Sequence, residues 1–547
     1  MPIAMSVADK PLTEKSNVIS KVLTRLAGEI EATDEQRRMC AVVQYEDQSY
    51  GWFVRQEFWG LRRDPHVLAV QSQARRQCEI ELREPIVCDL EELNRLYGEI
   101  APPSLRGGSQ VRERLEQLCE AAVAARASDL NFDLVDSTAQ VTIKIYGVWG
   151  GTIARFTEEE FRGLRTSAFY WANNGDNVEL IDTDQLASVT DKRKIPSELT
   201  GIRMAFSAPS DGSHFNMRFL YKDLPIVGQG LDPLDQPADI VNALYRIMSS
   251  ANGTWTIISP TENGKSTTAA IMVREWMRSR SYNVRVVGIG DPPETMIPDV
   301  RFYDVKSAKL EGIDPYGPGI RRLLRQTPDG VLLQEIRTRE AALGALEIGG
   351  LGYWTGTTTH GPEALGITAR YAELKVAKEI AYNPDSHIGW ISQRLLPLLC
   401  PACRRPLAQA AATDKRLEAI YRRYQDLGQF DADALYARGL GCGHCVPENN
   451  FGIAGIKGRK LVMEVIEPLP ELCELLAFGN EKSLSSLQPA REYWFEQMGG
   501  ISMRLRALPL LLSGLVGAGE FHERLVSDDR TFSYEMAQRP ELVRAAP

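Results

Sequence analysis

The chain has 547 residues, 44% hydrophobic and 25% charged, which is enough for several domains with hydrophobic cores and excludes a largely disordered protein. Nine cysteines are too few for a disulfide scaffold of this length. The 63 Lys and Arg residues against 72 Asp and Glu residues give a formal net charge of −9, which argues against general nucleic-acid coating because phosphate backbones bind to basic faces.

The first half of the chain predicts two α+β modules. Residues 1–105 form an N-terminal module of unknown role, in which the alternating stretch 41–55 predicts a strand pair. Residues 110–222 begin with an amphipathic helix and continue as a sheet. The strands predicted for that sheet lie near residues 141–146, 202–206 and 215–220. Residues 223–240 are rich in Pro and Gly and predict a hinge-like linker.

The second half of the chain predicts an α/β core with a parallel sheet at residues 241–395, a cysteine-bearing insert at 396–470 and a helical C-terminal region at 471–547. The longest apolar run, 507–519, is shorter than the about 20 apolar residues of a membrane span, so no transmembrane segment is expected. The first 16 residues carry charges where a secretory signal has an apolar run. We therefore expect a cytoplasmic protein that is able to dock on a membrane complex.

A phosphate-binding loop is the strongest chemical signal. The short β-rich strand 255–258 is followed by a loop that ends in Gly264, Lys265 and Ser266, in the register of a Walker A motif that has Ser259 in place of its first glycine. Backbone N–H groups and Lys265 are expected to hold the phosphates of ATP, and the Ser266 hydroxyl to ligate Mg²⁺. The residues of this predicted nucleotide loop are Pro260, Thr261, Glu262, Asn263, Gly264, Lys265, Ser266 and Thr267. A capped helix start is the alternative for a bare Gly-Lys-Ser.

Two carboxylate segments favour the nucleotide interpretation. The apolar run 284–289 leads to Glu294, and the run 331–333 leads to Glu335. Nucleotide sites of parallel sheets lie at the carboxyl ends of the strands. We therefore expect Glu335 to bind Mg²⁺ through water and Glu294 to orient or deprotonate the attacking water.

The order of these segments resembles the family of hexameric ATPases of type II secretion and type IV pilus assembly. Residues 290–294 are similar to the family's Asp box, 328–338 to its Walker B segment and 352–360 to its His box. The resemblance implies a RecA-like core after a PAS-like domain, catalytic roles for Glu294 and Glu335, and a γ-phosphate sensor at His360. Four positions depart from the family pattern, namely Ser259, Gly290, Gln334 and Tyr353.

The resemblance extends to the second module. The stretch 127–132 is similar to a family segment, with Asn131 in place of the usual His. Arg203 and Arg218 match two family arginines that lie on neighbouring strands and point at the nucleotide, in this chain or in its neighbour. A planar and permanently charged guanidinium suits γ-phosphate charge. A surface ion pair is the alternative for either arginine alone.

Four cysteines in two C-x₂-C pairs predict a structural zinc site. They are Cys400, Cys403, Cys442 and Cys445, and four thiolates give Zn²⁺ a closed tetrahedral shell. The alternative is redox chemistry, since Cys442 to Cys445 reads Cys-Gly-His-Cys. A redox pair requires a helix that starts at its first cysteine, whereas glycines precede this pair and Pro447 follows it. His444 is interpreted as a bystander.

These observations and the resemblance predict a cytoplasmic homo-hexameric ATPase. It is expected to use ATP, Mg²⁺ and Zn²⁺ and to power pilus assembly or protein secretion through an inner-membrane platform protein, with which it is peripherally associated. The divergent motifs suggest a type IVb or plasmid thin-pilus system. One alternative is a nucleotide-gated assembly scaffold with little hydrolysis. Another is a conjugation or DNA-transport motor, although no direct nucleic-acid partner is expected.

Overall fold

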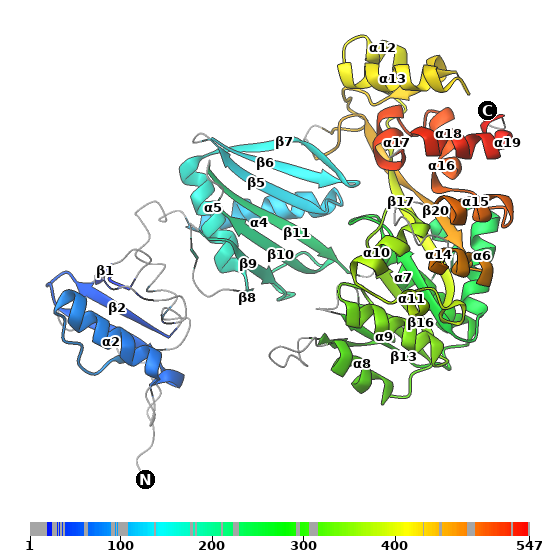
Figure 1. Cartoon of the computed structure of the whole chain (residues 1–547). Coiled ribbons are helices and arrows are strands. Elements are labelled where there is room, and N and C mark those ends of the chain that lie inside the picture. The colour runs from blue at the N-terminus through cyan, green and yellow to red at the C-terminus, as the bar shows by residue number, and fades with distance from the viewer. Residues whose placement is uncertain are drawn as a thin grey trace. The chain divides into compact units, whose positions relative to one another are not determined.

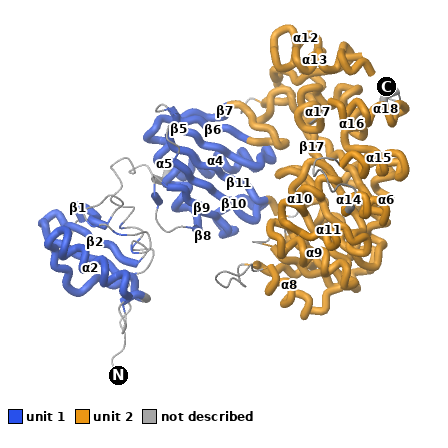
Figure 2. Tube along the Cα trace, viewed as in Figure 1, with its two compact units in different colours: residues 1–143, 152–220 blue, residues 144–151, 221–547 orange. Residues whose placement is uncertain are grey.

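The structure is a computed structural model whose contacts divide the chain into two compact units (Figure 2). Unit 1 comprises residues 1–143 and 152–220, and unit 2 comprises residues 144–151 and 221–547. The residues that the structure describes are 19–24, 30, 32, 36, 39–59, 64–88, 93, 96, 108–135, 138–175, 179–180, 183–208, 212–222, 229–290, 296–305, 316–429, 431–447, 451–478, 487–526 and 529–544. Part of the predicted linker, 223–228, therefore lies outside them.

The N-terminal part of unit 1 is a four-stranded sheet with apolar residues on both faces. Its elements are β1 (Ile19–Val22), β2 (Cys40–Tyr45), β3 (Tyr50–Arg55), η2 (Gln56–Phe58), α2 (Pro65–Cys78) and β4 (Ile86–Cys88), with strand order β1-β2-β3-β4. The predicted strand pair 41–55 is found as β2 and β3, which are antiparallel. Because side chains alternate across β2, Val42 joins one core cluster with Val67 and Val70 of α2, whereas Val43 joins the other.

The rest of unit 1 is a seven-stranded sheet in the order β7-β6-β5-β11-β10-β9-β8 (Figure 1). Its elements are α4 (Gly108–Ala124), β5 (Asp129–Val135), β6 (Thr138–Ile145), β7 (Val148–Thr157), α5 (Glu158–Trp171), β8 (Asn174–Gly175), β9 (Gln185–Val189), β10 (Leu199–Ser207) and β11 (Gly212–Tyr221). Phe132 of β5 and Phe215 of β11 stack with ring centroids 4.2 Å apart, and Phe161 of α5 packs on them. The opposite face of these two strands carries polar side chains.

Unit 2 contains a seven-stranded sheet in the order β14-β13-β15-β16-β12-β17-β20. Its strands are β12 (Gly253–Ile258), β13 (Val286–Gly290), β14 (Arg301–Asp304), β15 (Gly330–Leu333), β16 (Trp354–Thr359), β17 (His387–Leu399) and β20 (Ile456–Ile466). All neighbours are parallel except β17 and β20. The strand partners Ile258 and Thr359, and Ile289 and Leu333, show that β12, β13, β15 and β16 end at one edge of the sheet. The predicted α/β class with a parallel sheet is confirmed.

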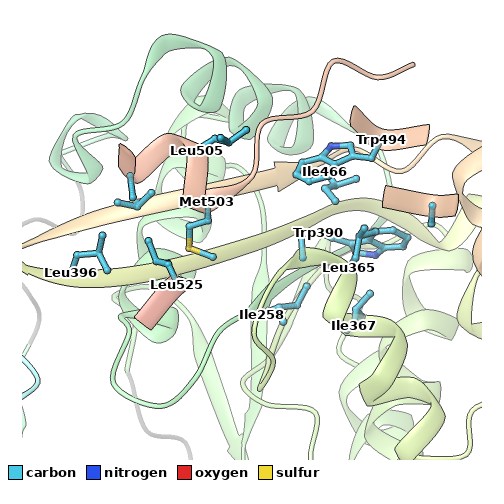
Figure 3. Close-up of a cluster of buried hydrophobic side chains, with 14 of the residues drawn as sticks. Ile258, Leu365, Ile367, Trp390, Leu396, Ile466, Trp494, Met503, Leu505 and Leu525 are labelled. Carbon is cyan, nitrogen blue, oxygen red and sulfur yellow. The ribbon is translucent and has the colours of Figure 1, made fainter. Parts of the chain in front are cut away.

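The helices of unit 2 include those that flank the parallel strands and a helical C-terminal region. The first group is η4 (Asp232–Leu234), α6 (Ala238–Ser249), α7 (Lys265–Ser279), α8 (Tyr316–Leu324), α9 (Arg339–Gly350), η6 (Ala364–Gly366), α10 (Ile367–Glu373), α11 (Lys378–Ala381) and η7 (Pro384–Ser386). The second is α14 (Pro470–Phe478), α15 (Gln488–Glu496), α16 (Met503–Leu512), α17 (Ala518–Leu525), α18 (Asp529–Gln538) and α19 (Pro540–Arg544). The cluster in Figure 3 joins β17 and β20 to this C-terminal region through Trp390, Ile466, Trp494, Met503 and Leu525.

The apolar run 507–519 is divided between two helices. It contributes to α16 and α17, and between them Gly514 has a φ of 66° and ends the first helix. Among the residues that the structure describes, no helix combines the length and the apolar character needed to cross a bilayer.

Candidate functional site

The predicted phosphate loop connects a fully buried strand to a helix. β12 ends at Ile258, and α7 begins at Lys265. Between them Glu262 and Gly264 have φ values of 62° and 81°, so the backbone turns sharply. No side chain caps the amino end of α7, which is the arrangement that lets first-turn N–H groups bind phosphate oxygens. The local geometry therefore fits a phosphate ligand.

Asn263 attaches this loop to the neighbouring strand β17. Its Oδ1 accepts a hydrogen bond of 2.9 Å from the backbone N–H of Leu395, and its carbonyl accepts one of 2.5 Å from Nε2 of Gln393. Its Nδ2 donates to the carbonyl of Thr261 at 2.9 Å. The side chain of Asn263 thus shapes the loop, and its backbone N–H remains the predicted nucleotide contact. Thr261 and Ser266 are exposed.

Lys265 lies next to His360. The Nζ atom of Lys265 donates to the carbonyls of Ser259 and Pro260 at 2.9 and 3.0 Å, and it lies 3.4 Å from Nδ1 of His360. The fold explains this proximity, because the last residue of β12 pairs with Thr359, directly before His360. Two predicted site residues that are 95 positions apart in sequence are thereby brought together.

Glu335 completes the same group. Its Oε1 lies 2.5 Å from Nε2 of His360, and its Oε2 accepts a 2.6 Å hydrogen bond from Nε of Arg337. The Glu335 side chain is 15% exposed, so these contacts are partly shielded from water. Lys265, His360 and Glu335 form one continuous series of contacts at the carboxyl ends of three strands. Such a group can bind an anion, coordinate a cation or orient water.

Glu294, the other predicted catalytic carboxylate, lies outside the described residues. The strand before it, β13, ends at Gly290, beside β15 at the edge of the sheet that carries Glu335. The predicted run 284–289 is thus found as a strand that is shifted by one or two residues.

The four departures from the family pattern occupy unstrained positions. Ser259 and Gln334 have no positive φ, so neither place requires glycine. The Gln334 backbone is held by Ile289 and by the Thr358 hydroxyl. Tyr353 precedes β16, whereas His360 follows it, so the two lie at opposite ends of a six-residue strand. This separation, roughly 20 Å at about 3.3 Å per residue, removes Tyr353 from the group around His360.

Arg203 and Arg218 lie on adjacent strands of unit 1. Arg203 alternates with the buried Ile202 on β10, and Arg218 with the buried Met217 on β11, so both belong to the polar face of the sheet. Arg218 donates from Nε to Oδ1 of Asp129 at 2.8 Å, across the β11–β5 pair. The Asp129 side chain is only 2% exposed, so it anchors Arg218 from below the surface.

The four predicted cysteines form one cluster in unit 2. Their sulfurs all lie within 4.8 Å of one another, and three of the pairs are separated by 3.8, 3.8 and 3.9 Å. A tetrahedral Zn²⁺ site with Zn–S bonds of about 2.3 Å has sulfurs about 3.8 Å apart, so the arrangement fits zinc. Cys445 also accepts N–H donors from Cys442 and Gly455, at 3.3 and 3.2 Å. Such donors stabilise thiolate ligands.

The surroundings of the cluster favour a closed metal site over a redox pair. Residues 443–445 form a turn, so no helix begins at Cys442. His444 is exposed and is absent from the group of nearby ligand atoms. The segment between the two cysteine pairs contains β18 (Arg405–Pro406), α12 (Leu407–Ala411), α13 (Lys415–Leu427), η8 (Ala432–Ala434) and β19 (Tyr436–Ala437).

Comparison with known proteins identifies the family. The model of the family described as type II/IV secretion system protein matches residues 105–499. The chain belongs to this family. Residues 1–104, and thus nearly all of the N-terminal module, lie outside the match.

The curated relatives of this chain are distant in sequence. The type II secretion system ATPase E of Vibrio cholerae is 25% identical over 354 residues, which are 64% of either chain. The type II secretion system protein E of Pseudomonas aeruginosa is 29% identical over 337 residues, which are 61% of this chain and 62% of that protein. The alignments therefore span less than two thirds of these relatives.

Solved structures also match. The ATPase DotB of Legionella pneumophila is 16% identical, with a TM-score of 0.48, over 75% of this chain and 94% of DotB. The pilus retraction motor PilT with bound ADP is 18% identical, with a TM-score of 0.46, over 76% of this chain and 98% of PilT.

Three residues of this secretion family member were missed as site residues by sequence reasoning. Arg337 contacts Glu335, and Asp129 contacts Arg218. Both residues lie inside segments that carried the family resemblance, and that location was the signal in the sequence that could have found them. Gln393 gave no such signal, because its contact with the loop joins residues that are 130 positions apart.

Proposed function

We propose that this chain is a cytoplasmic homo-hexameric ATPase that hydrolyses ATP to power pilus assembly or protein secretion through an inner-membrane platform protein. The observation that carries the proposal is the contact series of Lys265, His360 and Glu335 beside the phosphate loop. Family membership supports a secretion-related role. A type IVb or plasmid thin-pilus system is the specific setting we favour, because the motifs diverge from the family pattern.

The phosphate loop is the proposed binding site for ATP and Mg²⁺. Bound Mg²⁺-ATP supplies the scissile phosphoanhydride bond and the charge of the metal. The amino end of α7 would bind phosphate oxygens, the Lys265 ammonium would exchange the loop carbonyls for the β- and γ-phosphates, and the exposed Ser266 hydroxyl would ligate Mg²⁺. These roles use donors that the loop already presents.

The remaining site residues are assigned to stabilise the charge of the phosphates and the metal and to orient the attacking water. Glu335 would bind the metal through water, and His360, which contacts Glu335, would sense the γ-phosphate. Glu294 is assigned the task of orienting or deprotonating the attacking water. Arg203 and Arg218 are proposed to bring positive charge to the γ-phosphate of a nucleotide on this chain or a neighbouring one.

The tetracysteine cluster is proposed to hold a structural Zn²⁺. Its sulfur spacing fits the metal, and four thiolates leave no open coordination position for catalysis. Burial raises the pKa of Cys403 to about 12. A bound cation favours the thiolate form and so offsets that cost.

Steady-state phosphate release tests the proposal. Lys265→Ala and Glu335→Gln are each expected to lower turnover by about 100-fold or more, the loss typical of removing one preorganised charge-stabilising group. Glu335→Gln is expected to keep nucleotide binding, because it leaves the loop intact. The matched controls Lys415→Ala and Glu471→Gln alter exposed residues and should match the wild type. Wild-type turnover in either active-site variant would contradict the assignment.

A nucleotide-gated scaffold is the second candidate function. The observation in its favour is that both carboxylate oxygens of Glu335 are engaged, one by His360 and one by Arg337, so metal binding competes with these contacts. A scaffold would bind ATP with a wild-type rate of phosphate release equal to that of Lys265→Ala.

A further inference from the structure

The phosphate loop contains one acidic residue, whose negative charge disfavours phosphate binding. Glu262 is the one carboxylate between Ser259 and Ser266, a stretch expected to surround a triphosphate. Its backbone occupies the left-handed region with a φ of 62°, where glycine is favoured, and its side chain is 26% exposed. A negative charge here repels phosphate unless a cation neutralises it.

Lys144 supplies that cation. Its Nζ forms an ion pair with Oε2 of Glu262, and its side chain is only 16% exposed. It also lies 5.3 Å from the ring centroid of Trp149, which limits where the ammonium group can go. Both residues belong to unit 2, because the segment 144–151 is counted in that unit (Figure 2). A partly buried pair of this kind is screened less by salt than a surface pair.

The segment that carries Lys144 is held by contacts that lead back to the loop. Arg524 of α17 donates from Nη2 to the carbonyl of Gly147 at 3.3 Å and from Nη1 to the carbonyl of Leu395 at 3.2 Å. The N–H of Leu395 donates to Asn263, the residue after Glu262. The segment that carries Lys144 is thus connected to the phosphate loop twice, through the Lys144–Glu262 ion pair and through Arg524, Leu395 and Asn263.

A second cation faces the same acid. Arg459 of β20 interacts electrostatically with Glu262 and with Tyr146 of the 144–151 segment. Arg459 is exposed, whereas Lys144 is largely buried. Because Lys144 forms its ion pair with Glu262 directly, Lys144 is the main counter-ion of Glu262.

We propose that Lys144 is a positioning residue that neutralises Glu262 and so sets the affinity of the phosphate loop for nucleoside triphosphates. The inference rests on the proposed function of the loop in binding ATP. It requires that Lys144 matters only while residue 262 carries a negative charge.

A double-mutant cycle on the full-length chain tests this inference, with a fluorescent N-methylanthraniloyl ATP and Mg²⁺ as the probe. Lys144→Ala is expected to weaken binding about tenfold, because it removes the main counter-ion of a carboxylate in the phosphate loop. Glu262→Gln should bind at least as tightly as the wild type. The double variant should bind like Glu262→Gln, and Lys144→Arg, which keeps the charge, should bind like the wild type.

The controls make each outcome decisive. Lys415→Ala removes an exposed lysine of the same unit and should leave affinity unchanged. Equal losses from Lys144→Ala in the wild-type chain and in the Glu262→Gln variant would overturn the charge mechanism, as would wild-type affinity in Lys144→Ala. In both cases ATP binding by the wild type preserves the proposed function. If the wild type binds the probe no better than Lys265→Ala, the proposed function and this inference fall together.

Discussion

At the scale of single residues, the backbone conformation of Gly264 differs from that of Ser259, which replaces the first glycine of the Walker A motif. Gly264 has a φ of 81°, and a Cβ placed on it would lie 3.3 Å from Nε2 of Gln393. Ser259 has no positive φ, is fully buried, and donates its hydroxyl to the Pro260 carbonyl at 3.2 Å. The loop therefore depends on one glycine and accommodates serine at the other position.

This difference predicts opposite results for two small substitutions. Gly264→Ala should cost about 1–2 kcal/mol of loop conformational energy and weaken nucleotide binding about tenfold, because a side chain in the left-handed region is strained. Ser259→Gly should change affinity less than about twofold, because no strain is relieved. Nucleotide titration of both variants measures the effect. A gain of affinity in Ser259→Gly would show that the serine does impair the loop.

The contact between Arg218 and Asp129 also bears on the predicted catalytic role of Arg218. Its guanidinium is bonded to the buried Asp129, so it is not an unattached surface arginine. A tethered guanidinium loses less rotamer entropy when it meets a phosphate. The ion pair with Asp129 is therefore compatible with a catalytic role, although an ion pair was the alternative for an arginine considered alone.

At the scale of elements, the cysteine cluster is expected to determine whether the small insert is ordered. The purified chain should contain one Zn²⁺. Cys442→Ser should lose it, because zinc sites of this class require all four ligands. His444→Ala is the matched control, since this exposed neighbour should leave the metal in place. Elemental analysis with thermal unfolding checks both variants. A zinc-free wild type that unfolds cooperatively would contradict the metal site.

Strand β17 contains a buried histidine that should make stability depend on pH. Burial lowers the pKa of His387 to about 4, against a weaker opposing effect of its hydrogen bond to the carbonyl of Ala381. Its Nδ1 accepts a 3.2 Å hydrogen bond from Trp390, which also suits the neutral ring. Below about pH 6.5 the unfolded chain binds a proton that the folded chain does not, so the free energy of unfolding decreases as the pH falls toward 4.

The expected loss is about 2 kcal/mol between pH 7.5 and pH 5, at about 1.4 kcal/mol per pH unit below 6.5. Urea unfolding at the two pH values measures it. His387→Gln should remove this part of the pH dependence, while its amide can still donate to Ala381. His66→Gln, at an exposed position, should behave like the wild type. Identical pH dependence in the wild type and His387→Gln would mean that His387 is not the titrating group.

The local sequence pattern predicted the strands of the site well, but it did not predict the contacts between residues that are far apart in the sequence. The run 255–258 and the run 331–333 were found as β12 and β15, because apolar and β-branched residues predominate in strands that are buried on both faces. The bonds that join Asn263 to β17 and Lys144 to Glu262 connect residues more than 100 positions apart. They depend on tertiary folding, which periodicity does not report.

At the scale of the whole molecule, the two units are interleaved in sequence. The segment 144–151 belongs to unit 2, although the strands β6 and β7 continue from it into unit 1. Lys144 is therefore covalently continuous with the sheet that carries Arg203 and Arg218.

The charge of the whole chain argues against a DNA-transport motor. With a formal net charge of −9, the chain lacks the excess of basic residues that drives nonspecific DNA binding through counterion release. We expect single- and double-stranded DNA to change phosphate release less than about twofold at about 50 mM salt, where such binding is strong. Electrophoretic mobility shifts over a salt series provide the parallel measurement. DNA binding that falls steeply with salt and accompanies faster turnover would instead indicate a conjugation motor, because only a phosphate-contacting surface produces both effects.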